Sequence, residues 1–284
     1  MTSAKDYIQS TYMQNALTKP CEHCGKQLLT LVGSLVQQDE DDPRRNALLG
    51  LEMACNCEMA NLARTELQRE IEAVRRQNEA KLKAERLRGR LEASNMPETW
   101  YQRGLFAWLR RTPNEQAAFE AAVAFGQAMK RGEHPSLYIA GPIGTGKTML
   151  ASCLGVDLIR SGFSLRWSNV GDLLRALRAT FNSRENEEDV IRRYASPPIL
   201  VLDDLGKERP TEWAAEQLFA IFNRRYDHGK TTIVTTNYSG ADLVRRLTPK
   251  PDVTGYADDT TAQAIVDRLR GTASTIILEG HSKR

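Results

Sequence analysis

The residues from Gly141 to Thr148, GPIGTGKT, have the types and spacing of a phosphate-binding loop. Its three glycines lack Cβ atoms, so the backbone N–H groups can point inward and surround phosphates. Lys147 supplies a positive charge to the β- and γ-phosphates, and the Thr148 hydroxyl coordinates Mg²⁺. A buried-strand pattern precedes the loop and a helical pattern follows it, which distinguishes this motif from a simple glycine turn. The residues predicted to bind ATP are Gly141, Pro142, Ile143, Gly144, Thr145, Gly146, Lys147 and Thr148.

Two further segments end in polar residues that suit phosphate chemistry. Four apolar residues from Ile199 lead into Asp203 and Asp204, at the strand end where open α/β sheets bind ligands. Asp203 is expected to hold magnesium, directly or through water, and Asp204 to polarise the attacking water. The other interpretation is two solvated acids that begin a loop. Asn237, after another apolar run, is expected to orient the water, although asparagine can also simply end a strand.

Arginines are the remaining candidates for catalysis. Arg268 and Arg270 lie in IVDRLRG, an amphipathic pattern near the end of the sequence. Either could reach the γ-phosphate of an adjacent subunit and stabilise charge in the transition state. Arg224 and Arg225 compete for this role. The plainer alternative for each is a solvated basic helix face.

Four of the five cysteines form two closely spaced pairs, Cys21/Cys24 and Cys55/Cys57. Zinc prefers four tetrahedral ligands, and two such pairs supply two thiolates from each side. His23 is a possible substitute ligand. The alternative is that these residues are small core side chains, which is the interpretation we prefer for Cys153, inside the helix after the glycine loop.

Strands that alternate with helices must position these groups. Apolar strand patterns begin near positions 136, 163, 199 and 231, and amphipathic helical patterns lie between them. This alternation predicts an α/β fold with a central parallel sheet covered on both faces. Three zones are expected: a zinc-binding module at 1–60, a charged helix at 61–94 and the α/β domain at 95–284. The apolar stripe of the helix is irregular, so it is interpreted as a spacer or partner-binding arm rather than a long coiled coil.

Composition excludes several classes of protein. Hydrophobic residues make up 41% and charged residues 26% of 284 residues, and the net charge is +3. These values are ordinary for a globular protein, and nucleic-acid binding would depend on local basic patches. The sequence contains neither an apolar run long enough to span a membrane nor a secretory signal. An odd number of cysteines favours a reducing compartment, so a cytoplasmic location is expected.

Together the motifs resemble the AAA+ ATPases of the DnaC/DnaI/IstB type. GPIGTGKT, VLDDLGKERPTEW, FNRRY, TTIVTTN, IVDRLRG and ILEGHSKR follow one another in that order over about residues 135–284. The resemblance implies a P-loop AAA+ core without the C-terminal helical lid. It also implies that Asn237 is the sensor residue and that Arg268 is the arginine finger, which acts on a neighbouring subunit. Asp204 stands where glutamate is commoner, so hydrolysis is expected to be slow and dependent on assembly.

The family contains loaders of the replicative helicase and helper ATPases of transposition. Some loaders carry an N-terminal zinc module, which transposition helpers generally lack, so the cysteine pairs favour a loader. Expected partners are a hexameric replicative helicase, single-stranded DNA and other copies of the chain, without a membrane. The alternatives are a transposition helper on duplex DNA and a nucleotide-switch adaptor with little turnover. The resemblance assigns DNA contacts to Trp167, Ser168, Arg175 and Arg178; the other interpretation is a core tryptophan with solvated arginines.

Overall fold

The computed structural model describes residues 16–33, 49–52, 55–208, 211–250, 257–271 and 273–280. The chain forms two compact units, Met1–Leu82 and Lys83–Arg284, and the division falls within one long helix, α2. Each unit is described by itself. Within the described ranges, no helix is both long and apolar enough to cross a membrane.

The first unit contains a small antiparallel sheet. Its strands, in the order β1-β2-β3, are β1 (Ala16–Pro20), β2 (Gln27–Gly33) and β3 (Leu49–Glu52). The short β1–β2 connection carries one cysteine pair, and the second pair lies just before α2. The sheet and the start of α2 therefore bring the two pairs together.

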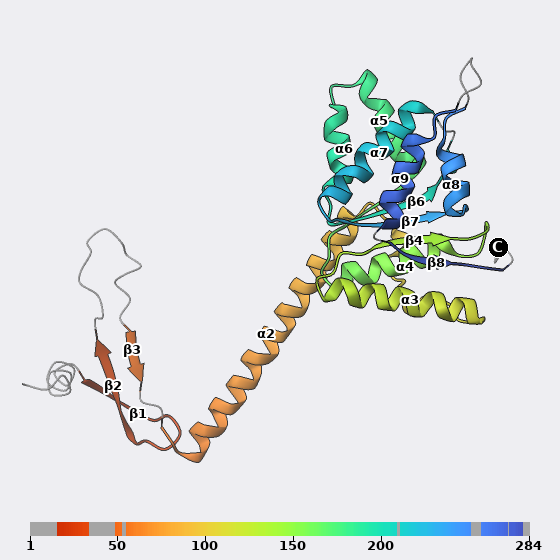
Figure 1. The fold of residues 1–284 in the computed structure, drawn as a ribbon. Helices are drawn as coiled ribbons and strands as arrows, with labels where there is room; N and C mark the ends of the chain where they lie inside the picture. Colours follow the sequence, from red (N-terminus) through yellow and green to blue (C-terminus); the bar gives the residue numbers. More distant parts are fainter. Residues whose placement is uncertain are drawn as a thin grey trace, which may run out of the picture. The chain divides into compact units, whose positions relative to one another are not determined.

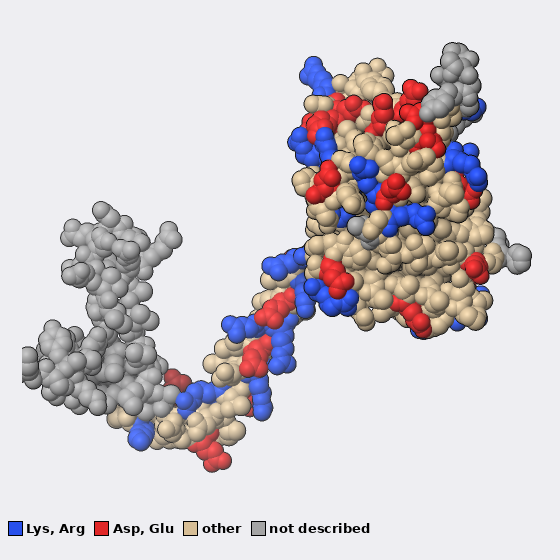
Figure 2. All heavy atoms as spheres, viewed as in Figure 1, with Lys and Arg blue, Asp and Glu red and all other residues tan. Residues whose placement is uncertain are grey.

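Helix α2 (Glu58–Ala93) agrees with the predicted charged helix and begins slightly earlier. Ion pairs four residues apart, such as Glu72–Arg76 and Arg88–Glu92, lie on its exposed surface, where solvent screens them and each contributes little to helix stability. Figure 2 shows basic and acidic side chains distributed along the helix, with uncharged residues between them. The end of α2 belongs to the second unit, where Leu91 is buried in the core.

The second unit is an α/β domain around a five-stranded parallel sheet of order β5-β6-β7-β4-β8 (Figure 1). Its strands are β4 (Ser136–Ala140), β5 (Leu165–Asn169), β6 (Ile199–Leu205), β7 (Thr231–Thr236) and β8 (Ala273–Ile277). Four of these confirm the predicted strands. The fifth, β8, was not predicted, because it is a half-exposed edge strand without a long apolar run.

Helices cover both faces of this sheet, as the alternation of strands and helices predicts. They are α3 (Pro113–Lys130), α4 (Lys147–Arg160), α5 (Val170–Ala179), α6 (Glu187–Ala195), α7 (Glu212–Asp227), α8 (Gly240–Leu247) and α9 (Thr260–Gly271). Short 3₁₀ turns are η2 (Glu98–Trp100), η3 (Leu105–Ala107) and η4 (Thr180–Asn182). In Figure 1, α3 and α4 lie on one side of the sheet and α5 to α9 on the other.

Two apolar cores result, one on each face. Successive strand residues point to opposite faces: Leu137 and Ile139 belong to the α3/α4 core, and Tyr138 and Ala140 to the core beneath α5 to α9. The interior strands are thus buried on both sides, and the carboxyl ends of the parallel strands form one edge of the domain. The glycine loop follows β4 at this edge.

The segment between α2 and α3 completes the core on the α3/α4 face of the sheet. Trp108 is buried there, whereas Phe106, two residues earlier, is 75% exposed. The reason is local: in the η3 turn Leu105 takes the buried position, and its N–H donates to Asp157 Oδ2 at 2.9 Å.

Candidate nucleotide site and metal centre

The glycine loop connects β4 to the N-terminus of α4, where a helix dipole and free N–H groups favour phosphate. Two glycines cannot be replaced without moving the chain. A Cβ atom on Gly141 would lie 2.2 Å from the Leu278 carbonyl oxygen, and one on Gly146 would lie 3.1 Å from the Trp108 indole. Both residues also have positive φ. The loop shape is therefore held from both sides, by the segment after β8 and by Trp108.

Lys147 lies inside the loop rather than in solvent. It is buried, and its Nζ donates to the Pro142 carbonyl oxygen at 2.8 Å. Burial lowers the pKa of Lys147, and the nearby Asp204 and Asp203 carboxylates oppose that shift. A partly desolvated ammonium at this position interacts more strongly with a phosphate than one in bulk water.

Thr148 and Asp203, the predicted magnesium residues, are in direct contact. The Thr148 hydroxyl lies 2.9 Å and 3.1 Å from the two carboxylate oxygens of Asp203. Burial raises the pKa of Asp203, while hydrogen bonds from Thr235 and Thr148 lower it. A hydroxyl and a buried carboxylate are the oxygen ligands that Mg²⁺ prefers, so these residues fit the metal.

Thr235 is a site residue that the sequence analysis did not single out. Its fully buried hydroxyl donates to Asp203 Oδ1 at 2.6 Å and accepts the backbone N–H of Asp204 at 2.9 Å. Thr235 thereby holds both carboxylate residues at the end of β6. The sequence contained one signal for this role: Thr235 carries a hydroxyl near the end of β7, two residues before Asn237, and β7 is the strand beside β6.

The backbone of Asp204 is left-handed, with φ of 62°, a conformation that is uncommon outside glycine and to which aspartate and asparagine are better suited than most residues. Its carboxylate is partly exposed and lies 3.2 Å from Lys207 Nζ. Asn237, half-exposed, follows β7 one residue after Thr236, which pairs with Leu205 of β6. Asn237 therefore lies at the same sheet edge as the two aspartates, and its role and that of Asp204 remain predictions.

The arginine candidates separate clearly. Arg225 is 1% exposed and donates to backbone carbonyls and to Thr232, so it is not available to a neighbouring subunit. Arg224 forms a two-bond ion pair with Glu188. Arg270 is exposed and lies over Gly240.

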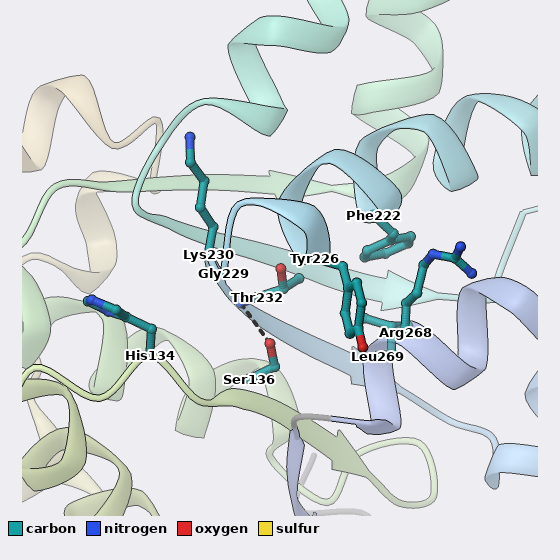
Figure 3. Close-up of a pocket in the computed structure, with 9 residues that line it drawn as sticks. All are labelled: His134, Ser136, Phe222, Tyr226, Gly229, Lys230, Thr232, Arg268 and Leu269. Atoms are coloured by element: carbon teal, nitrogen blue, oxygen red, sulfur yellow. Dashed lines mark hydrogen bonds between the residues drawn. The ribbon is translucent and has the colours of Figure 1, made fainter.

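Arg268 lies at the edge of the sheet opposite the glycine loop. It lines a small cavity together with Ser136, the first residue of β4, and Thr232, the second residue of β7 (Figure 3). Figure 3 shows its side chain extending beside Phe222 and away from His134 and Lys230. Its Nε donates to Asn223 Oδ1 at 2.7 Å. The strand length separates Arg268 from the loop of its own chain, so any contact with a γ-phosphate must be made to another subunit.

Trp167 and Ser168, to which the resemblance assigns DNA contacts, are both buried in this structure. Trp167 is 6% and Ser168 2% exposed, so the indole offers no free face to a base. The reason is that the end of α2 covers the edge strand β5: the Trp167 N–H donates to the Ser94 carbonyl at 2.7 Å. Arg175 and Arg178 are exposed and remain predictions.

An aromatic pair, of which Phe181 is exposed and Trp213 half-buried, lies beside Arg178 instead. Phe181 is 63% exposed and packs edge-on against Trp213, with ring centroids 5.6 Å apart. The Arg178 guanidinium lies 5.2 Å from the Trp213 ring centroid. Sequence reasoning missed this pair because Trp213 is distant in sequence, on the first turn of α7.

The four paired cysteines of the first unit form one cluster. Cys21, Cys24, Cys55 and Cys57 have Sγ atoms that all lie within 4.8 Å of one another, and none forms a disulfide. Backbone N–H groups of His23 and Cys24 lower the pKa of Cys21 to about 6. The Ala60 N–H donates to Cys57 Sγ at 3.4 Å. Four thiolates that converge in this way fit tetrahedral zinc. The cluster does not include His23, and Cys153 is buried in the second unit.

We expect the purified chain to contain one bound zinc ion, and Cys55→Ser to lose most of it. A site with three thiolates loses affinity, and a small module of this kind depends on its metal for folding. Metal content measured by atomic emission, with circular dichroism of the same samples, checks this. Cys153→Ser is the matched control and is expected to keep full zinc. Undiminished zinc in Cys55→Ser would contradict the four-cysteine assignment.

Comparison with known proteins gives the family. The model of the family described as IstB-like ATP binding protein matches residues 132–284. The replicative helicase loader DnaI of Bacillus subtilis is 24% identical over 174 residues, 61% of this chain and 55% of its own. An insertion-sequence ATP-binding protein of Mycobacterium tuberculosis is 30% identical over 149 residues, 52% of this chain and 55% of its own. The replicative helicase loader DnaC of Escherichia coli is 27% identical over 155 residues, which are 54% of this chain and 58% of its own.

Solved structures agree on the fold. The crystal structure of DnaI has a TM-score of 0.55 and 25% identity, covering 67% of this chain and 95% of that one. The crystal structure of the DnaC helicase loader has a TM-score of 0.54 and 24% identity, covering 64% of this chain and 99% of that one. The chain spans a little over half the length of the curated relatives it matches. The family match covers more than half of this chain, including the glycine loop, both aspartates and Arg268. The chain therefore belongs to the IstB-like ATP binding protein family, and its second unit is a P-loop AAA+ core of the DnaC/DnaI type.

Proposed function

We propose that this chain is an ATPase that loads a hexameric replicative helicase onto single-stranded DNA. The family contains both helicase loaders and ATP-binding proteins of insertion sequences, so the AAA+ core alone does not decide between them. The four-cysteine cluster of this chain supports the loader, because the resemblance drawn from the sequence implies that some loaders, unlike transposition helpers, carry an N-terminal zinc module. In this proposal residues 1–60 and α2 contact the helicase, and the AAA+ core assembles with other copies.

At the nucleotide site, Lys147 and the loop N–H groups bind the phosphates and hold the γ-phosphate in place. Magnesium, when bound by Thr148 and Asp203, neutralises charge on the β- and γ-phosphates. Asp204 accepts a proton from the attacking water, and Asn237 orients that water. The water oxygen bonds to the γ-phosphorus as the bond to the β–γ bridging oxygen breaks, which yields ADP and phosphate. Thr235 keeps both aspartates in position through its two hydrogen bonds.

Single-stranded DNA is proposed to bind along the α5–η4 segment. Exposed arginines at 175 and 178 can contact phosphates, and Phe181 beside Trp213 offers an aromatic face to a base. Stacking on an aromatic ring contributes about 1–3 kcal/mol per base and tolerates any sequence. This replaces Trp167 as the proposed stacking residue.

The full-length chain is expected to copurify with a hexameric helicase, and deletion of residues 1–82 is expected to abolish this. The deletion is placed before Lys83 because Leu87 and Leu91 pack on the AAA+ core. A pulldown with mass spectrometry provides the measurement, and ATP binding by the truncated chain shows that its core is intact. Helicase binding that survives the deletion would refute the N-terminal role.

DNA preference separates the alternatives. A loader is expected to bind single-stranded DNA more tightly than duplex, and to lose that binding in Phe181→Ala. Preference for duplex, with filament growth in ATP, would favour the transposition helper instead. An ATPase rate indistinguishable from background, with and without DNA, would favour a nucleotide-switch adaptor.

A further inference from the structure

One face of α2 carries apolar side chains that nothing in the described part of the chain covers. Leu67, Ile71 and Val74 are 56%, 55% and 57% exposed. Leu67 and Ile71 are four residues apart, and Ile71 and Val74 are three apart, so all three lie on one side of the helix. Asn78, four residues after Val74, lies on the same side. We call these four residues the seam. All of them belong to the first unit.

The seam has the period of a two-stranded coiled coil. Ile71 and Asn78 occupy one heptad position, a, while Leu67 and Val74 occupy the other, d. A β-branched residue at a and leucine at d favour two parallel strands, and a single asparagine at a fixes register because it pairs with its counterpart. The single polar residue of the seam is thus satisfied best by a second copy of the same seam.

The flanking charges are also self-complementary. Glu70 precedes Ile71 at position g, and Arg75 follows Val74 at position e, five residues later. In a parallel pair in register, position g of one helix faces the following e of the other. Glu70 of each copy would then face Arg75 of its partner. Within the described residues, Glu70 and Arg75 form no ion pair inside their own chain.

Charged residues limit the seam at both ends. Arg64, one heptad before Ile71, donates to the Cys55 carbonyl oxygen at the cysteine cluster. Lys81 occupies the d position after Val74. Three apolar layers bury little surface, so the contact must be weak by itself and gain strength where other contacts keep two copies together.

We propose that two copies of this chain pair through the seam as a short parallel coiled coil in register. The pairing is independent of nucleotide, so it can be tested separately from the ATPase and loader functions. It gives α2 a role besides the proposed helicase contact, because it joins copies at a place outside the AAA+ core.

Sedimentation velocity of the full-length, zinc-loaded chain without nucleotide tests the proposal over a range of concentrations. A reversible monomer–dimer equilibrium is expected. Ile71→Lys should weaken it by about 100-fold or more, since two isoleucine side chains lose their burial. Leu62→Lys is the matched control, because Leu62 is 53% exposed on the opposite side of the helix. It should leave the dimer unchanged.

Four further variants test register and direction. Asn78→Ile should tighten association, because it replaces the polar pair by an apolar one, and a variant that merely fails to fold cannot do this. Glu70→Arg and Arg75→Glu should each weaken the dimer, and the double variant should restore it. An antiparallel pair predicts no restoration, since like positions then face each other.

Three outcomes overturn the proposal. A chain that stays monomeric at every concentration has no such pairing. A dimer that Ile71→Lys leaves intact is held elsewhere. If the chain is monomeric and Ile71→Lys lowers helicase copurification instead, the seam binds a helix of the helicase. Circular dichroism of each variant confirms that α2 is still helical.

Discussion

Arg268→Ala is expected to lower the rate of ATP hydrolysis by about 10³-fold or more, because an arginine finger contributes that much in this class of reaction. Arg268 lies at the sheet edge opposite the glycine loop, while Arg225 is buried and Arg224 is paired with Glu188. ATP binding should be unchanged, since the loop of the same chain is intact. Steady-state hydrolysis and nucleotide affinity together measure the two effects.

A mixing experiment tests whether the arginine acts between subunits. Lys147→Ala should abolish ATP binding in its own chain while keeping Arg268. Mixed with the Arg268→Ala chain, it supplies the missing arginine to an intact loop, so part of the activity should return. Arg270→Ala, on the same helix and exposed, is the control and should retain most activity. Full activity in Arg268→Ala, or no recovery on mixing, contradicts an arginine finger at this position.

Arg225→Met is expected to destabilise the second unit by about 3–5 kcal/mol, because buried carbonyl groups that lose their donor cost about 1–3 kcal/mol each. The Arg225 guanidinium joins three parts of the fold. It donates to the carbonyl oxygens of Tyr194 and Ala195 at the end of α6, and to Pro197 at 2.8 Å, and its Nε donates to Thr232 Oγ1 at 2.9 Å. Methionine fills similar volume and satisfies none of these acceptors.

Urea unfolding followed by tryptophan fluorescence and circular dichroism measures the change. Arg224→Met is a matched control on the neighbouring residue. Its ion pair with Glu188 is partly exposed, so we expect a loss of at most about 1 kcal/mol. Equal midpoints for the two variants would show that Arg225 does not stabilise the fold in this way.

The sequence by itself predicted those features that depend on neighbours in the chain. The glycine loop is contiguous, and its residue types follow from the need for backbone N–H groups and one lysine around phosphate. The three interior strands, β6, β7 and β4, could be recognised because burial on both faces requires an unbroken run of residues that tolerate burial. The four clustered cysteines were also identifiable, since each pair is local and only the distance between pairs depends on folding.

Tertiary structure decided which polar and aromatic groups are accessible. Trp167 and Phe181 are both aromatic residues near arginines, yet one is buried and the other exposed. The difference arises because the end of α2 supplies hydrogen bonds to the edge strand β5 and covers Trp167. No local pattern contains that information, since the covering segment comes from about seventy residues earlier.

The contacts of Thr235 and of the arginines also depend on tertiary structure. Thr235 meets Asp203 only because β7 lies beside β6 in the sheet. Arg224 and Arg225 are adjacent in sequence, but the helix turns one toward α6 and the other into the core. Residue type and spacing determined that this chain binds nucleotide. Strand order and packing decided which residue holds the aspartates in place and which of the candidate arginines is buried in the core.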